Sequence, residues 1–206
     1  MPSRLLVPGV DQTIRERRSV RTFLPDPLDD TEVLALLDAA RWAPSPHNSQ
    51  PWRFVVVRPG PTRSSLAEAM ADRWLADLTV HREESTALLR KVQTRRRRLE
   101  EAPVAIVVCL TGDRLDAYPD PQRREAEWLT AEHSLGAATQ NLLLAARARG
   151  LGSWWICAPA FCPDTIRGSL GLPIGWAPRA LILVGRPARP PADSPRDALD
   201  GLVLFR

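Results

Sequence analysis

The chain has 206 residues, of which 44% are hydrophobic and 25% charged, close to the average for globular domains. This composition argues against a disordered chain, and the longest apolar run, 104–110, is too short to span a bilayer. The net charge of +4 comes almost wholly from arginine, since Lys91 is the only lysine, and it favours anionic ligands.

The length predicts a single domain, residues 1–206, and the first residues contain no apolar stretch typical of a signal peptide. We therefore expect a cytoplasmic protein that makes no membrane contact. The cysteines and histidines of the chain are Cys109, Cys157, Cys162, His47, His81 and His133. They have no metal-site spacing and share no motif, so we expect no metal and ordinary roles for them.

The first half of the chain predicts helices around one strand. A capping box at Asp29 to Glu32 and apolar residues at helical spacing predict a helix over 32–42, which ends before two prolines. A β-branched and aromatic run predicts a buried strand over 52–57. Two further helices are expected over 62–78 and 83–99.

The second half predicts three strands and the longest helix. Strands are expected over 102–110, 153–158 and 179–185, with a helix over 123–149 and a short helix before the last strand. A proline-rich arm follows, with a candidate edge strand over 202–205. This order predicts a layered α/β arrangement. The glycine motifs of Rossmann dinucleotide sites and P-loops are absent from the sequence.

Two short segments are the strongest functional signals. The first, Arg17-Arg18-Ser19-Val20-Arg21, places three guanidinium groups around a serine and could bind a phosphate, although a solvated basic turn is the alternative. The second, residues 44–54, is a proline-braced loop that leads into a strand. Ser45 and Asn48 of this loop offer donors and acceptors to the edge of a planar heterocycle, and a rigid connector is the alternative.

These segments, separated by 22 residues, resemble the two flavin-binding segments of the FMN-dependent nitroreductase family. Within that family the chain is most similar to the C-terminal FMN reductase domain of the bifunctional ligase that matures the deazaflavin coenzyme F-420. The residues that carry this closer likeness are 17–21, 72–78, Ala102-Pro103, Tyr118-Pro119-Asp120 and 149–156. Two departures are that 206 residues leave no room for the ligase domain, and that Cys157 stands where a glycine is expected.

The resemblance implies an α+β fold with three αβα layers around a central mixed β-sheet, in an intertwined homodimer that binds FMN between its subunits. By this likeness Arg17, Ser19 and Arg196 hold the phosphate, and Arg18 and Arg21, on either side of Val20, face the pyrimidine edge. The loop residues Pro44, Ser45 and Asn48 line the ring, and Trp155, Ile156 and Cys157 lie near the flavin N5. The flavin carries the chemistry, so no catalytic side chain is predicted.

Trp74 and Asp77 match positions that face the second ligand in the deazaflavin-processing relatives, although a core role is the alternative for the tryptophan. The arginines at 95–98 could receive acidic groups of that ligand or form a solvated helix face.

We therefore expect an FMN-dependent oxidoreductase that transfers hydride through reduced flavin to a planar or acidic small molecule, with a deazaflavin precursor of coenzyme F-420 favoured. The electron donor would be NAD(P)H or a reduced deazaflavin. The alternatives are a general NAD(P)H-dependent nitroreductase or quinone reductase, and a non-catalytic flavin-binding module. Nucleic-acid binding is disfavoured, because the basic run has no interleaved aromatic residues and no reader motif.

Overall fold

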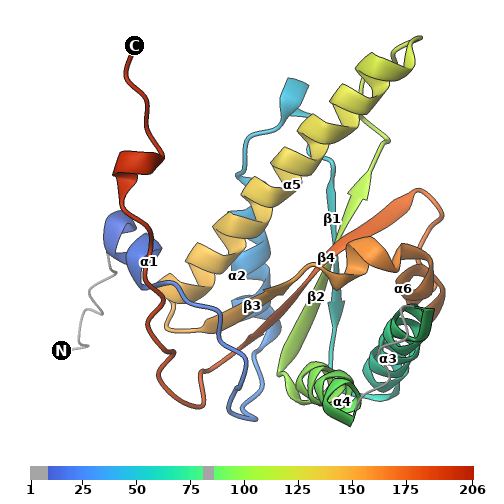
Figure 1. Ribbon diagram of the computed structural model, residues 1–206, viewed down its shortest axis with the longest axis vertical. Helices are drawn as coiled ribbons and strands as arrows, with labels where there is room; N and C mark the ends of the chain where they lie inside the picture. Colours follow the sequence, from blue (N-terminus) through green and yellow to red (C-terminus); the bar gives the residue numbers. More distant parts are fainter. Residues whose placement is uncertain (1–8, 81–85) are drawn as a thin grey trace.

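The computed structural model describes residues 9–80 and 86–206. Its helices are α1 (Val10–Glu16), α2 (Asp30–Arg41), α3 (Pro61–Val80), α4 (Thr86–Glu101), α5 (Pro121–Ala148) and α6 (Pro163–Leu170), with short 3-10 turns η1 (Pro46–Asn48), η2 (Ala158–Phe161) and η3 (Leu199–Gly201). The strands are β1 (Trp52–Val57), β2 (Val104–Thr111), β3 (Gly152–Ile156) and β4 (Trp176–Gly185). They form one sheet in the order β1-β2-β4-β3 (Figure 1).

The helix ends follow the signals in the sequence. Asp29 caps α2 through the predicted box: its carboxylate accepts from the Glu32 amide at 2.7 Å, and the Glu32 carboxylate accepts from the Asp29 amide at 3.0 Å. Asp120 caps α5 by accepting from the Arg123 amide at 2.9 Å. Gly150, with φ of +74°, then allows the chain to leave α5 and enter β3.

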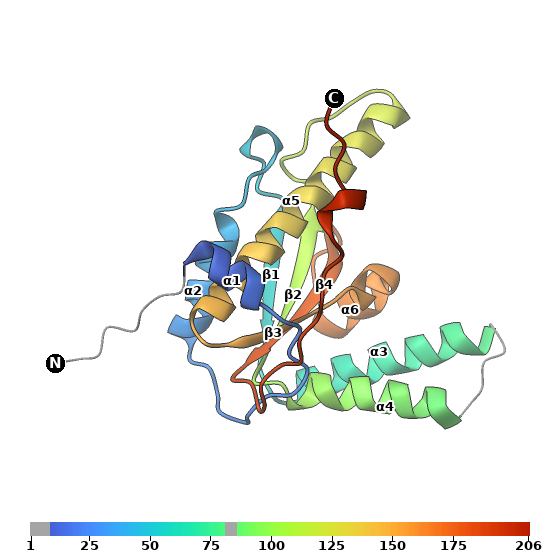
Figure 2. The ribbon, with the colours of Figure 1, turned by 60° about the vertical axis from the view of Figure 1, so that its left-hand side comes forward.

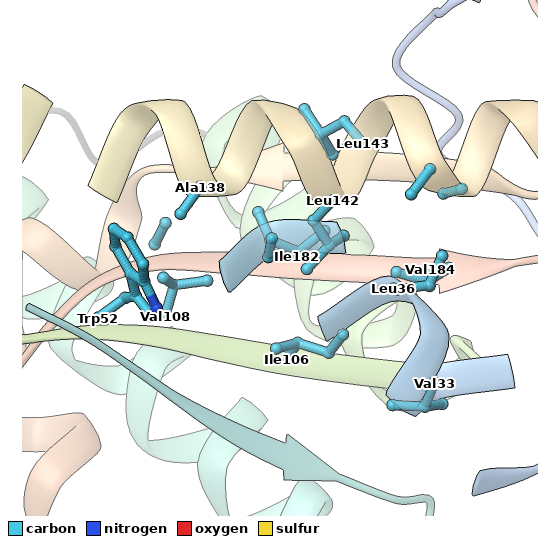
Figure 3. Close-up of a cluster of buried hydrophobic side chains, with 14 of the residues drawn as sticks. Val33, Leu36, Trp52, Ile106, Val108, Ala138, Leu142, Leu143, Ile182 and Val184 are labelled. Carbon is cyan, nitrogen blue, oxygen red and sulfur yellow. The ribbon is translucent and has the colours of Figure 1, made fainter. Parts of the chain in front are cut away.

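The sheet lies between two helical layers, as predicted. Every residue of β2 is buried, and successive side chains point to opposite faces. Ile106 and Val108 pack with α2 and α5 in the cluster drawn in Figure 3, which also holds Leu36 and Leu142. Val107 belongs to the second cluster, formed with residues of α3, α4 and α6. A continuous apolar strand therefore separates two cores, which confirms the three-layer αβα arrangement.

The sheet is antiparallel at every strand pairing among the described residues, so the expectation of a mixed sheet was wrong. The cause is the position of β4. After β2, helix α5 returns the chain to the end of the sheet where β2 began, so β3 runs in the same direction as β2. Because β4 lies between these two strands and runs the opposite way, the parallel pair never forms.

Two segments extend from the layered body. The α3–α4 hairpin projects to one side, and the chain after β4 runs as an extended arm past α1 and α5 (Figure 2). The strand expected over 202–205 is not observed; the arm instead contains η3, and its apolar side chains there are exposed. Among the described helices, none combines the length and the apolar character needed to cross a bilayer.

Candidate functional site

The arginine-rich segment 17–21 is attached to the free edge of β3. The Val20 amide donates to the Ser153 carbonyl at 2.9 Å, and Ser19 forms a parallel bridge with the same residue. Val20 is buried, and an ideal Cβ built on Gly152 would lie 2.8 Å from its side-chain carbons. Since only a glycine permits this close approach, the packing fixes where the arginines lie relative to β3.

Three arginines gather at the start of this segment. Burial lowers the pKa of Arg17, and the charges of Arg196 and Arg18 lower it further, so the three cations lie close together. Arg18 donates to the carbonyls of Arg15 and Arg17 and lies 3.4 Å from the Asp193 carboxylate. Arg17 and Arg196 have no carboxylate partner in the described part of the chain. An incoming anion would relieve their mutual repulsion.

The far end of β3 lines a cavity of about 560 Å³ between the sheet edge and the helices on the same face. The lining residues that belong to the predicted site are Trp74, Asp77, Trp155, Ile156 and Cys157. Its wall is mainly apolar and aromatic, with a few charged groups at the side of α3 and α4. This chemistry suits a planar heterocycle that carries polar edges.

Trp74 and Asp77, which the resemblance places facing a second ligand, both lie on this wall together with the end of β3. Trp74 is half-buried, and the Arg95 guanidinium lies 4.1 Å from its ring centroid. The Asp77 carboxylate pairs with Arg73 at 2.9 Å, one turn earlier on α3. Trp74 is therefore a cavity wall rather than a core side chain.

The thiols differ in accessibility. Cys157 is exposed and lines the cavity, whereas Cys109 and Cys162 are buried. Burial raises the pKa of Cys109 to about 12 and also raises the pKa of Cys162, so both stay protonated at neutral pH.

The proline loop lies elsewhere within the single chain. Pro44, Ser45 and Asn48 precede the Trp52 end of β1, which is one edge of the sheet, whereas segment 17–21 lies along β3, the other edge. The register also places them at opposite ends, because Trp52 pairs with Leu110 while Ser153 lies near the start of β2. Figure 1 shows the same separation. One chain therefore does not bring Ser45 and Asn48 to the arginines.

The loop itself is conformationally strained. His47, Asn48 and Gln50 have φ values of 52°, 52° and 47°, which side chains with a Cβ rarely adopt. Ser45 stabilises the turn, since its Oγ accepts from the Gln50 amide at 3.1 Å. Three such residues within four positions are typical of a loop whose shape serves binding.

Three of the five buried side-chain atoms that lack a hydrogen-bond partner among the described residues belong to the segments above. Arg18 Nε lies in segment 17–21, Ser49 Oγ in the proline loop and Trp155 Nε1 at the end of β3, whereas Arg63 Nε and Arg147 Nε lie elsewhere in the fold. Because buried polar groups are normally satisfied, the first three atoms fit a ligand with polar edges and an anionic tail, such as FMN.

Sequence reasoning missed two aromatic side chains of this region. The ring of Trp154 lies 5.6 and 5.4 Å from the guanidiniums of Arg98 and Arg21, and Phe161 adds an exposed ring to the cavity. The helical spacing of the arginines along α4 could have indicated which of them lie on the same face of the helix. Of the histidines, His47 lies 3.5 Å from the Asp116 carboxylate, His133 is exposed on α5, and His81 lies outside the described residues.

Comparisons with known proteins agree with this geometry. The model of the Nitroreductase family matches residues 14–186. The chain is 34% identical to the 5,6-dimethylbenzimidazole synthase of Rhodospirillum rubrum, over 87% of this chain and 82% of that protein. It is 33% identical to the NADH dehydrogenase of Thermus thermophilus, over 93% of each. A protein from Desulfovibrio desulfuricans, assigned as a nitroreductase and solved in complex with FMN, superposes with a TM-score of 0.74 at 29% identity, over 97% of each chain.

Proposed function

Because the chain belongs to the Nitroreductase family, we propose that it is an FMN-dependent oxidoreductase that passes electrons from NAD(P)H to a planar acceptor. The main support is the attachment of segment 17–21 to β3, which joins a group of arginines to the cavity at the far end of the same strand. When bound there, FMN supplies reversible two-electron chemistry. The protein then has to bind, orient and shield reactants, and needs no nucleophile.

The phosphate would be held by Arg17, Ser19 and Arg196. A phosphate dianion is best bound by charge-assisted donors, and burial together with the charges of Arg196 and Arg18 lowers the pKa of Arg17, which has no carboxylate partner among the described residues. Arg21 and Arg18 would lie at the pyrimidine edge, where a cation stabilises negative charge on the ring. The backbone of Trp155, Ile156 and Cys157, at the end of β3, would contact the opposite edge.

We also propose that a second copy of the chain supplies Ser45 and Asn48. These residues lie at the opposite sheet edge from the arginines, so one chain offers an incomplete site. Large apolar side chains are exposed in regions that a partner could cover: Val10, Ile14, Leu34, Trp42, Leu199, Leu202, Leu204 and Phe205. Exposed apolar surface of this extent favours a homodimer.

The acceptor would stack in the cavity, with Trp74 as its aromatic wall. A deazaflavin precursor of coenzyme F-420 is the acceptor we favour, because it is planar and carries acidic groups that suit the basic side of α4. Quinones and nitroaromatic compounds are the general alternative. Titrating the purified protein with the deazaflavin coenzyme, and recording its absorbance spectrum, tests this choice: no spectral change at micromolar coenzyme would contradict it.

Replacing Arg17 and Arg196 together by alanine tests the phosphate assignment. The phosphate would lose two charged donors, and FMN affinity should fall at least about a hundredfold. The visible flavin absorbance of the dialysed protein measures this loss. Arg97→Ala removes an exposed arginine whose guanidinium is 3.7 Å from Glu101, and serves as the control. A double variant that stays fully yellow would show that the phosphate binds elsewhere.

Turnover separates an enzyme from a binding module. The FMN-loaded protein is mixed anaerobically with NADH or NADPH, and the loss of flavin absorbance is followed in time. Adding a quinone should then reoxidise the flavin and restore its visible absorbance, at a rate that matches steady-state turnover. If neither nicotinamide donor bleaches the flavin, the protein binds FMN without using it in this way.

A further inference from the structure

The four consecutive arginines of α4 form two pairs with different surroundings. Arg96 lies 3.1 Å from Glu100 and 3.6 Å from Glu68, and Arg97 lies 3.7 Å from Glu101. These two are neutralised by carboxylates on α4 and α3. No ion pair with a described residue neutralises the other two, Arg95 and Arg98.

The unpaired arginines lie against aromatic rings beside the cavity. The guanidinium of Arg95 is 4.1 Å from the centroid of Trp74, and that of Arg98 is 5.6 Å from the centroid of Trp154. Both rings line the cavity. The rings hold the guanidiniums without neutralising them, so the charge stays available to a ligand.

A third unpaired arginine comes from the chain after β4. The Ala188 amide donates to the Thr22 carbonyl at 3.1 Å, which ties this part of the arm to the segment beyond Arg21. Arg189 follows directly, is exposed, and has no carboxylate partner among the described residues. Its position next to the Arg21 end of segment 17–21 brings it toward Arg98.

Electrostatics agree with this placement. Burial lowers the pKa of Arg98, and the nearby charges of Arg21, Arg97, Arg189 and Arg95 lower it further. Like charges in one place destabilise each other unless an anion binds among them. The sequence alone offered a solvated helix face as the alternative, and Arg96 and Arg97 fit that description while Arg95 and Arg98 do not.

We propose that Arg95, Arg98 and Arg189 form a second anion site, separate from the FMN phosphate site, which binds a terminal phosphate (a phosphate monoester) of the substrate that enters the cavity. This inference rests on the proposed function and narrows the substrate class to planar molecules with a terminal phosphate. The phosphate comes either from the electron donor or from the acceptor. Arginine suits either source because its planar fork binds phosphate oxygens in pairs.

The test compares forms of each reactant that differ by one terminal phosphate, in the FMN-loaded enzyme: NADPH carries a 2′-phosphate that NADH lacks, and FMN carries a phosphate that riboflavin lacks. The variants are Arg95→Gln with Arg98→Gln, and Arg189→Gln alone; the matched control is Arg97→Gln, from the same helix. The donor arm measures KM for NADPH and for NADH. The acceptor arm measures KM for free FMN and for riboflavin. Inhibition by inorganic pyrophosphate provides a readout that does not depend on either substrate.

In one arm, we expect KM for the reactant with the terminal phosphate to rise at least about tenfold in the double variant, the effect of losing a charge-assisted hydrogen bond. KM for the counterpart that lacks this phosphate should change less than about twofold, and pyrophosphate inhibition should weaken in parallel. Arg189→Gln should act in the same direction, and Arg97→Gln should leave all values unchanged. The arm that responds identifies the source of the phosphate.

Three outcomes would overturn the inference. If the double variant changes KM equally for the two reactants within each arm, the arginines do not bind the substrate's terminal phosphate. If Arg97→Gln has the same effect as the double variant, only the overall charge matters. If the double variant loses bound FMN, these arginines belong to the cofactor site. In each case the wild-type enzyme still binds FMN and turns over, so the proposed function stands or fails on its own test.

Discussion

Arg63 shows how one residue can join three elements. Its side chain is 1% exposed and donates to the carbonyls of Val57, Leu99 and Ala102, which lie at the end of β1, in the last turn of α4 and before β2. Burial lowers its pKa to about 10, so it remains charged at neutral pH. A single guanidinium thus donates hydrogen bonds to backbone carbonyls of three segments that meet at the base of the α3–α4 hairpin.

Replacing Arg63 by methionine should strongly destabilise the fold. Methionine keeps an apolar stem in place of the arginine stem, but it leaves buried carbonyls without donors, and we expect a loss of about 3 kcal/mol in the free energy of unfolding. Urea denaturation followed by circular dichroism measures it. Arg97→Met, at an exposed position of the same hairpin, should change the free energy by less than about 0.5 kcal/mol. Equal stability of the two variants would show that water replaces the guanidinium.

At the residue scale, the sequence can identify a segment by its composition, but it cannot show which distant residues surround a side chain. Segment 17–21 was identified from its composition, and its attachment to β3 agrees with a binding role. Arg63 falls within the helix expected over 62–78, and nothing in the local sequence shows that backbone carbonyls of three segments meet around it. The division of the arginine run into paired and unpaired members likewise depends on where Trp74 and Trp154 lie in space.

At the scale of elements, the contact between segment 17–21 and β3 decides the geometry of the proposed FMN site. Gly152→Ala would place a methyl carbon 2.8 Å from the side-chain carbons of Val20, so one of the two segments must shift. We expect FMN affinity to fall at least about tenfold, together with about 1–3 kcal/mol of stability from overpacking.

The double variant Gly152→Ala with Val20→Gly is the control for this prediction. It removes all three Val20 carbons that the added methyl carbon would meet, and it keeps the hydrogen bond from the residue 20 amide to the Ser153 carbonyl, so FMN binding should largely return. Fluorescence titration with FMN measures the affinity of both variants. If the single variant binds FMN as tightly as the wild type, the position of segment 17–21 does not control the site.

Elements with strong local signals were predicted well. The strand over 52–57 coincides with β1, and the long helix differs from α5 by two residues at its start and one at its end. Strand order could not be predicted, because the insertion of β4 between β2 and β3 depends on long-range pairing. The prediction of a strand over 202–205 was wrong for a related reason: an apolar run needs a neighbouring strand, and no strand of the described residues pairs with it.

At the scale of the whole molecule, the two segments proposed to bind FMN lie at opposite edges and ends of one sheet. Local patterns recognised both segments, but they could not show that a single chain keeps them apart. If both contribute to one FMN site, each site must combine residues of two chains. Such an arrangement makes FMN binding depend on dimer formation. It predicts that two chains with different defects can form an intact FMN site when they assemble into one dimer.

Mixing two defective variants tests this directly. Arg17→Ala removes a donor from segment 17–21, and Ser45→Ala with Asn48→Ala removes polar groups from the proline loop; each variant alone should bind FMN weakly. After the two are unfolded and refolded together, half of the dimers are mixed, and each mixed dimer has one intact site and one doubly defective site. Tight FMN binding should therefore return to about one quarter of all sites. If the two segments act within the same subunit, every site keeps one defect and mixing restores nothing. Refolding each variant separately controls for recovery that is due to refolding alone.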